Sequence, residues 1–435
     1  MRLRYLKITL ALGALLYPAT ASYAADYKVL HIGTLLVDAR QAPTSAQTVV
    51  IKDEIIQSVQ AGYIAADMVE TEEGDDVEVV DLKDSFVMAG LIDAHMHMTS
   101  VPDRKKARTD VVYKSLAERA VMAVPAVRMK LLAGYTTVRD LGGSRDIIVA
   151  LRDGIKDGFI PGPRILTATN TVSPTGGHGD ANGFKPGLIP SNSSICDGVG
   201  DCRRAVRQAV KNGADVIKYV ATGGVMSNIA AGTGQQFSQE EQNVIVQTAH
   251  SMGRKVAAHA HGTDGINAAL RAGADSIEHG TYLDDESIKL FKKTGAYLVP
   301  TLTVANWAAE KGNEEGFFPP AVAAKARRVG PQTIKGLMRA YKAGVKIAMG
   351  SDFSGENHQA SKKEMQLMVK AGMSEKDVLI AGTIHGADLL GLSDTIGTLE
   401  KGKSADLVAY KASPLDNIDT MLDPQLVMLK GEVAK

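Results

Sequence analysis

Short apolar segments alternate with amphipathic helical patterns from about residue 87 to residue 391, and this alternation constrains the fold more than any other feature. The clearest apolar segments are residues 135–138, 164–168, 216–220, 255–259, 276–279, 297–300 and 346–350. Repeated strand–helix order predicts an α/β fold with a parallel sheet, and about eight repeats predict closure into a (β/α)8 TIM barrel. An open doubly wound sheet competes with the barrel, but no Gly-x-Gly-x-x-Gly fingerprint follows an early strand.

Both ends of the chain carry strand-like, turn-rich sequence instead. Residues 25–86 and 396–435 are predicted to form one small β-sandwich domain, which leaves residues 87–395 for the barrel. A length of 435 residues accommodates one barrel and one small second domain. Within the barrel, Ser238 stands three residues before Glu241 and ahead of an apolar run, which predicts a capping box at the start of a helix.

The first 24 residues have the pattern of a secretory signal peptide. Basic residues within 1–7 precede an apolar run at 8–16 that is too short to span a bilayer, and small residues lead to Ala24. A buried core helix is the alternative, but Pro18 follows the run and disfavours it. We expect cleavage near Ala24 and an exported product, periplasmic or secreted. No later segment has the roughly 18 consecutive apolar residues of a membrane span, so no membrane association is expected after cleavage.

The charge balance excludes several kinds of partner. Lys plus Arg and Asp plus Glu number 49 each, so the formal net charge is zero. No net field draws the chain toward nucleic acid or an anionic membrane, and a small-molecule or dipeptide substrate is expected. Whether the chain forms a homo-oligomer stays open.

The two cysteines, Cys196 and Cys202, flank a glycine-containing loop. In an oxidising compartment this loop can close a small disulfide, and the sequence leaves a bridge and two free thiols equally open. A separate structural zinc site is not expected, because the pair supplies too few ligands.

Six residues able to bind a metal stand at or just after the ends of predicted strands: His95, His97, Lys218, His259, His279 and Asp352. The first two are two residues apart, so both imidazoles can share one face of a strand. Taken singly, each has an ordinary explanation, such as a core histidine or an aspartate that caps a helix. Active sites of TIM barrels lie at the C-terminal ends of the strands, so their joint occurrence on five strands predicts one metal-binding active site.

Several short motifs carry these residues in a fixed order: residues 90–97, 136–140, 175–180, 217–218, 221–225, 259–262, 277–280 and 350–352. Together they resemble the amidohydrolase superfamily, over essentially the whole mature length. The resemblance is most specific to its prolidase and imidazolonepropionase-like branch. Exported members of this branch include dipeptidases that act on a C-terminal proline or basic residue.

The resemblance implies two divalent metal ions and a ligand set for each. By this likeness, His95 and His97 bind the more buried ion, and Asp352 touches it. His259 and His279 bind the second ion. Imidazole and carboxylate ligands suit Zn²⁺, which is the expected metal, and they also tolerate Mn²⁺, Co²⁺ or Fe²⁺.

Lys218 is expected to bridge the two ions as N6-carboxylysine. A lysine ammonium would repel metals, whereas the carbamate formed with carbon dioxide is an anion with two oxygens, and burial between cations favours it. Two adjacent ions would lower the pKa of a shared water toward about 7, and the resulting hydroxide would attack an amide carbonyl. Asp352 would then accept the proton and deliver it to the departing amine.

Further residues are assigned smaller roles. His178, in a glycine-rich loop after the third barrel strand, is expected to polarise or orient the substrate. His261 shares strand parity with His259 and is a candidate substrate contact, although the strand is expected to end there. Arg139 and Asp140 are expected to form a structural pair below the site.

These residues predict a binuclear, metal-dependent hydrolase of carbon–nitrogen bonds, a dipeptidase or carboxypeptidase-like enzyme that releases a C-terminal residue. Xaa-Pro substrates are favoured, although Phe237 stands near a point where some prolidase-like relatives carry a carboxylate-binding tyrosine. A cyclic-amide or lactone hydrolase or a deaminase of the same superfamily is the alternative. Such deaminases carry a glutamate where this chain has Gly262, which disfavours that reading. A non-catalytic periplasmic binding protein is a remote third option, because the ligand set is complete.

Overall fold

The computed structural model describes residues 25–99, 104–180, 182, 193–227, 232–352 and 358–435. The predicted signal peptide, residues 1–24, lies outside the described part of the chain. Among the described residues, none of the helices combines the length and the hydropathy that a membrane crossing requires.

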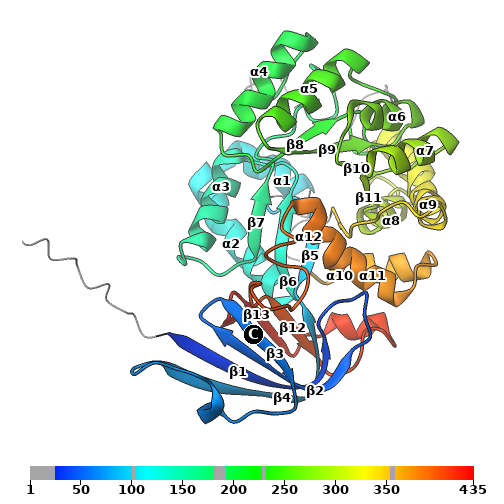
Figure 1. Cartoon of the computed structure of the whole chain (residues 1–435). Helices are drawn as coiled ribbons and strands as arrows, with labels where there is room; N and C mark the ends of the chain where they lie inside the picture. Colours follow the sequence, from blue (N-terminus) through cyan, green and yellow to red (C-terminus); the bar gives the residue numbers. More distant parts are fainter. Residues whose placement is uncertain (1–24, 100–103, 181, 183–192, 228–231, 353–357) are drawn as a thin grey trace, which may run out of the picture.

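Strands from both ends of the chain form one sheet (Figure 1). In spatial order its members are β14 (Glu432–Val433), β13 (Leu426–Leu429), β12 (Leu407–Tyr410), β4 (Asp76–Ala89), β1 (Asp26–Leu36), β2 (Thr44–Lys52) and β3 (Ile55–Ala61). The C-terminal strand β12 pairs antiparallel with β4, and β1 pairs parallel with the other edge of β4. Residues from near the two ends of the chain therefore share one hydrogen-bonded unit.

This unit differs from the predicted sandwich, because its strands are connected as a single seven-stranded sheet. The register of β1 against β4 shifts between Ile32 and Thr34. Gly33 lies at this shift, and a Cβ atom there would come within 1.9 Å of the Lys83 carbonyl oxygen. Strands can bend at such an irregularity, and a single bent sheet can then form both layers of a sandwich.

The middle of the chain contains two parallel sheets. One has the order β5 (Leu91–Met96), β6 (Tyr135–Asp140), β7 (Arg164–Thr167). The other has the order β11 (Tyr297–Val299), β10 (Ser276–His279), β9 (Lys255–Ala260), β8 (Val216–Val220). Parallel neighbours that follow one another along the chain confirm the predicted α/β class with strand–helix repeats.

Hydrogen bonds join the two sheets at both edges. After β7, the Val172 amide donates to the Lys218 carbonyl at 2.8 Å. On the other side, the extended segment 345–350 pairs with β11, and the Ala94 amide of β5 donates to the Met349 carbonyl at 2.9 Å. This arrangement is of the TIM-barrel type, and segment 345–350 takes the place of the last strand.

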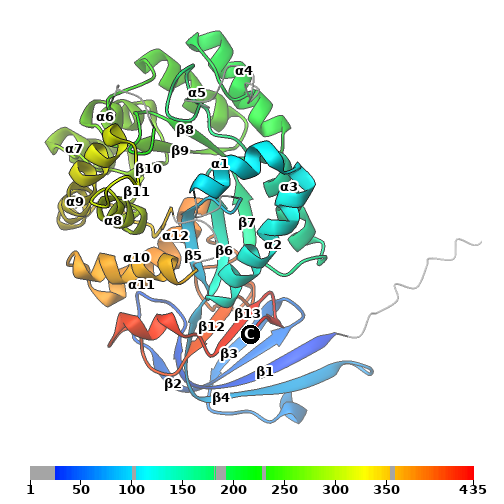
Figure 2. The ribbon, with the colours of Figure 1, turned by 180° about the vertical axis from the view of Figure 1, so that it is seen from behind.

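Helices surround these strands, whereas the seven-stranded sheet lies at one end of the molecule (Figures 1 and 2). They are α1 (Arg104–Tyr113), α2 (Leu116–Leu132), α3 (Arg145–Lys156), α4 (Gly198–Lys211), α5 (Gln239–Ser251), α6 (Thr263–Ala272), α7 (Asp285–Thr294), α8 (Leu302–Lys311), α9 (Pro320–Lys342), α10 (His358–Lys370), α11 (Glu375–Gly382) and α12 (Ile384–Leu390), with short 3-10 helices at Ala66–Met68 and Ile418–Leu422. The predicted capping box of Ser238 and Glu241 is present at the start of α5 and is thereby confirmed.

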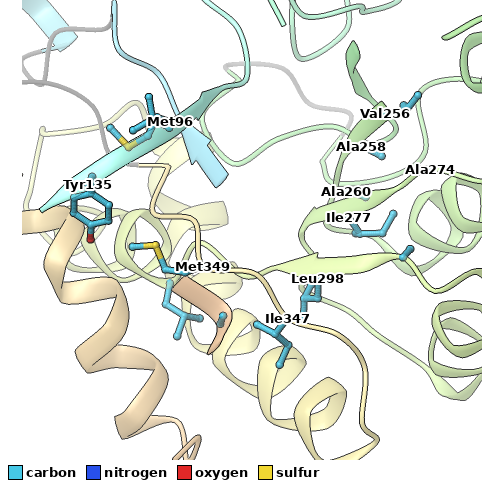
Figure 3. Close-up of a cluster of buried hydrophobic side chains, with 14 of the residues drawn as sticks. Met96, Tyr135, Val256, Ala258, Ala260, Ala274, Ile277, Leu298, Ile347 and Met349 are labelled. Atoms are coloured by element: carbon cyan, nitrogen blue, oxygen red, sulfur yellow. The ribbon is translucent and has the colours of Figure 1, made fainter. Parts of the chain in front are cut away.

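Strand β9 shows how the core directs side chains to the site. Val256, Ala258 and Ala260 belong to the buried cluster between the strands and the helices (Figure 3). Ala257 belongs to a second, small cluster made by residues of other barrel strands. Because alternate residues of a strand face opposite sides, His259 shares the side of Ala257 and faces the interior of the strand ring.

Candidate active site

The first histidine pair and the aspartate meet above the strand ends. His95 lies in β5, His97 follows that strand, and Asp352 follows segment 345–350. Asp352 Oδ1 lies 3.2 Å from His97 Nε2 and 3.6 Å from His95 Nε2. The structure therefore brings together the three residues that were expected to share one ion.

A second group of histidines lies beside them. Potential ligand atoms of His259, His261 and His279 all lie within 4.8 Å of one another, as do those of His95, His279 and Asp352. His279 Nε2 is 2.9 Å from His259 Nδ1. His279 belongs to both groups and connects them. His261, which the sequence favours only as a weak substrate contact, lies inside this cluster.

Divalent cations fit these donors. Among the described residues, the buried Nε2 atom of His259 has no hydrogen-bond partner, which is costly unless another ligand satisfies it. The residues surround a cavity of about 150 Å³, whose lining includes all six predicted metal ligands together with His178 and His261. Converging imidazoles and one carboxylate form the donor set that zinc and similar ions prefer.

Hydrogen bonds at the Nδ1 atoms, on the side of each ring that faces away from the cavity, hold two of these histidines in place. His97 Nδ1 donates to the Gly142 carbonyl oxygen at 2.6 Å. His279 Nδ1 is 2.6 Å from Thr301 Oγ1. Such partners fix the ring orientation and leave Nε2 to face the centre, as in most protein metal sites.

Glu278 is the site residue that the sequence interpretation missed. Its Oε2 accepts a hydrogen bond from His95 Nδ1 at 2.7 Å, and its Oε1 accepts one from Arg139 Nη2 at 3.0 Å. Burial alone would raise the pKa of Glu278, but Arg139 and His95 outweigh it and lower the pKa to about 2. Strand alternation would turn Glu278 away from its neighbour His279. Residue 279 has a φ of 73°, however, so the alternation breaks there and both side chains face inward.

The predicted structural pair of Arg139 and Asp140 was wrong. Arg139 binds Glu278, whereas Asp140 accepts hydrogen bonds from the backbone amides of Met98 at 2.7 Å and Gly142 at 3.1 Å. Adjacent residues of β6 point to opposite faces, so their side chains cannot readily pair. Asp140 instead supports the segment that follows His97.

Lys218 is buried in the site, with 4% of its surface exposed. Burial lowers its pKa to about 8, against the attraction of Glu278 and Asp352. A substantial fraction of the amine is therefore neutral near pH 8, and only the neutral amine adds carbon dioxide. These surroundings favour the chemistry that a carbamate requires.

Asp352 stays ionised in the site. Burial would raise its pKa, but His95 and His97 outweigh the burial and hold the pKa of Asp352 well below its usual range. Its backbone amide donates to the His95 carbonyl at 2.7 Å, and its φ of 49° is left-handed. The strained backbone turns the carboxylate toward the histidines, as is common at functional sites.

His178 lines the same cavity from the loop after β7. Its ring lies 4.4 Å from the His259 ring, and Nδ1 hydrogen-bonds to Ser227 Oγ.

The two cysteines form a disulfide in the same region, which settles the alternative that the sequence left open. The Cys196 amide donates to the Ser173 carbonyl at 3.0 Å, so the bridge adjoins the start of the His178 loop.

The metal-free protein is expected to lose stability as the pH falls below about 6.5. Burial holds the pKa of His95, His259, His261 and His279 below the ordinary histidine value, so the folded chain keeps these rings neutral while the unfolded chain takes up protons. His97 opposes this trend, because Asp352 outweighs burial and raises its pKa. The net loss between pH 7.5 and 5.5 is on the order of 3 kcal/mol.

Urea denaturation of chelator-treated protein at the two pH values measures this loss. The decline should continue toward pH 3, because burial lowers the pKa of His261 to about 3. Equal midpoints at pH 7.5 and 5.5 would contradict the buried, neutral histidine cluster.

A parallel strand ring with imidazole and carboxylate ligands at its strand ends is typical of metal-dependent hydrolases. Residues 86–434 match the model of the amidohydrolase family, and the chain belongs to this family. It is accordingly a hydrolase of carbon–nitrogen bonds, which confirms the predicted family and enzyme class.

Individual relatives share most of their length with this chain. Ochratoxinase from Aspergillus niger is 33% identical over 359 residues, which cover 78% of this chain and 73% of that protein. A solved Xaa-Pro dipeptidase with methionine bound in its active site is 35% identical, with a TM-score of 0.87 and coverage of 94% of this chain and 99% of its own. A solved prolidase complexed with N-methylphosphonate-L-proline is 29% identical, with a TM-score of 0.82 and coverage of 94% and 99%.

Proposed function

We propose that the protein is a binuclear metal-dependent peptidase that releases the C-terminal residue of a dipeptide or similar amide, with Xaa-Pro as the favoured substrate class. The observation that carries this proposal is the convergence of the predicted ligands around one cavity. The residues that would hold the two ions are His95, His97, His259, His279, Asp352 and, as its N6-carboxyl derivative, Lys218. Zn²⁺ is the proposed metal, with Mn²⁺, Co²⁺ or Fe²⁺ compatible with the same donors.

In this mechanism, bound ions would supply Lewis-acid chemistry, by activating a water molecule and polarising the amide carbonyl. Asp352 accepts the proton of the attacking water, since its carboxylate is ionised and faces the histidines. It then delivers that proton to the departing amine. His178, which lines the same cavity beside His259, orients the substrate.

The rest of the cavity is suited to a substrate whose C-terminal residue has an uncharged side chain. Its wall away from the ligands is mostly apolar, with contributions from the segment after β8 and from helices α8 and α9: Val225, Met226, Val304, Ala305, Ala308 and Val329. Among the described lining residues, the charged side chains are those of the metal site. Against these described residues a basic C-terminal residue would be buried without an acidic partner, which is costly. A proline or another apolar residue fits this wall better.

Phe237 does not take part in the pocket. Its side chain is 1% exposed, and its ring lies 6.3 Å from that of Tyr219. Tyr219 in turn donates to Gln242 of α5 at 3.0 Å, on the outer side of the strands. A substrate carboxylate would therefore bind elsewhere, and His178 and His261 are the proposed contacts.

A dipeptide library that varies the C-terminal residue tests this function. Metal-reconstituted protein is expected to hydrolyse dipeptides with C-terminal proline or other apolar residues at least about tenfold faster than those with arginine or lysine. Ochratoxin belongs in the same screen, because ochratoxinase is a relative. Turnover of a lactone or a cyclic amide, without hydrolysis of any dipeptide, would replace the peptidase assignment with the superfamily alternative.

Three further proposals concern the barrel, the second domain and the location of the protein. We infer that the strand ring is a closed (β/α)8 barrel over residues 87–395, because backbone hydrogen bonds connect its two sheets at both edges. Residues 25–86 and 396–435 are proposed as the second domain. Export to the periplasm or the medium is proposed from residues 1–24, and the disulfide supports an oxidising compartment.

A further inference from the structure

Helix α9 presents a row of side chains to the cavity side of the molecule. Lys325, Val329 and Thr333 are four residues apart and therefore lie on one face of the helix. Val329 and Thr333 line the cavity. Thr333 Oγ1 is 3.1 Å from Thr281 Oγ1, and Thr281 Oγ1 is 2.8 Å from His261 Nδ1. The helix thus contacts the site directly at one end of this row.

Lys325 stands at the other end of the row and is 7% exposed. Its Nζ donates to the Ser227 carbonyl oxygen at 2.6 Å and to the Gly224 carbonyl oxygen at 3.0 Å. A buried ammonium is costly unless its hydrogen bonds are satisfied, and hydrogen bonds from a charged donor are the stronger kind. The lysine therefore connects α9 firmly to the backbone of residues 224–227, which follow β8.

The same backbone holds the ring of His178. Ser227 Oγ hydrogen-bonds to His178 Nδ1. Gly224 lies against the ring, where a Cβ atom would come within 2.2 Å of Cε1. Any shift of residues 224–227 would therefore move the ring or change its hydrogen bond. The position of the His178 ring matters for the reaction, because this ring lies 4.4 Å from the ring of His259, a proposed metal ligand.

We propose that Lys325 is a positioning residue for His178: its two hydrogen bonds hold residues 224–227 in the place where they orient the imidazole toward the reacting amide. This inference rests on the proposed function, in which His178 orients the substrate. Lys325 itself does not line the cavity. Its effect on the His178 ring passes through the backbone that it binds.

Lys325→Met keeps the length and the burial of the side chain but removes both hydrogen bonds. We expect kcat to fall between about tenfold and a hundredfold, since small displacements of a catalytic group have effects of this size. Metal content should stay that of the parent protein. Lys335→Met is the matched control, because Lys335 is exposed on the same helix.

A double-mutant cycle separates positioning from general destabilisation. If Lys325 acts through His178, the double variant His178→Ala/Lys325→Met should have the kcat of His178→Ala alone. If the loss of kcat in the double variant instead equals the product of the losses in the two single variants, the proposal is wrong. The cycle uses whichever amide or ester the parent protein hydrolyses in the library screen.

A second readout does not depend on turnover. The second readout is the NMR spectrum of protein that carries isotope-labelled histidine. The NMR signals of the His178 ring are identified as those that disappear in His178→Ala. These signals should shift in Lys325→Met and stay in place in Lys335→Met. Unchanged His178 signals in Lys325→Met would overturn the positioning role, whereas failure of every peptide substrate would overturn only the proposed function.

Discussion

Asp352→Asn is expected to lower kcat/KM by about 10³-fold while the protein stays folded and keeps its metal ions. The amide that replaces the carboxylate has nearly the same shape and still offers an oxygen to the site. It cannot accept the proton of the attacking water, because its neutral oxygen is a very weak base. The loss should therefore appear mainly in kcat and much less in KM.

Elemental analysis, thermal unfolding and steady-state kinetics on one preparation measure these quantities together. Asp394→Asn is a matched control, since Asp394 is exposed and distant in sequence from every ligand. Near-normal rates for Asp352→Asn would refute its role as proton carrier. If the rate falls only in proportion to lost metal, Asp352 serves as a ligand alone.

Lys218→Met is expected to abolish turnover and to reduce the metal content to at most one ion per chain. Methionine fills a similar volume but cannot form the carbamate that is proposed to bridge the ions. Lys211→Met, at the exposed end of α4, should behave like the parent protein. Two tightly bound ions and normal rates in Lys218→Met would exclude the bridging role.

The bridge also predicts how the metal-free protein takes up metal. Carbon dioxide adds to the neutral amine, and burial lowers the pKa of Lys218 to about 8. The neutral fraction rises as the pH increases through 8, so reconstitution with zinc at equal concentrations of dissolved carbon dioxide should be faster at pH 8.5 than at pH 7. Full activation in buffer free of carbon dioxide would contradict the carbamate.

The sequence predicted the metal ligands because each one marks the end of an apolar strand, and strand ends meet at one rim of a parallel ring. Lys218 and His259 illustrate this, since simple alternation turns both inward. Glu278 was missed because alternation counted from an inward His279 places it outward. Ile277 packs against the helices, so Glu278 faces inward by ordinary alternation, and His279 turns inward through its left-handed backbone. Periodicity alone cannot reveal such a break, although a carboxylate directly before a ligand histidine is a usable signal.

Helix α9 illustrates a second limit. Its amphipathic pattern indicates which face is buried but not which segments it contacts. The pairing of Lys325 with residues 224–227 depends on how α9 packs over the rim, which local sequence does not encode. The same holds for the N-terminal unit, where β1 and β4 stay paired across the register shift at Gly33 and belong to one sheet, whereas the sequence assigned these strands to a sandwich.

The pairing of β4 with β12 has a consequence for biosynthesis. Ala89 pairs with Leu407, so the nascent chain exposes one edge of β4 until translation has passed residue 407. An unpaired edge is a template for aggregation, and contacts between distant residues form slowly. Chaperone dependence and sensitivity to C-terminal truncation should therefore be concentrated in this sheet, far from the catalytic rim.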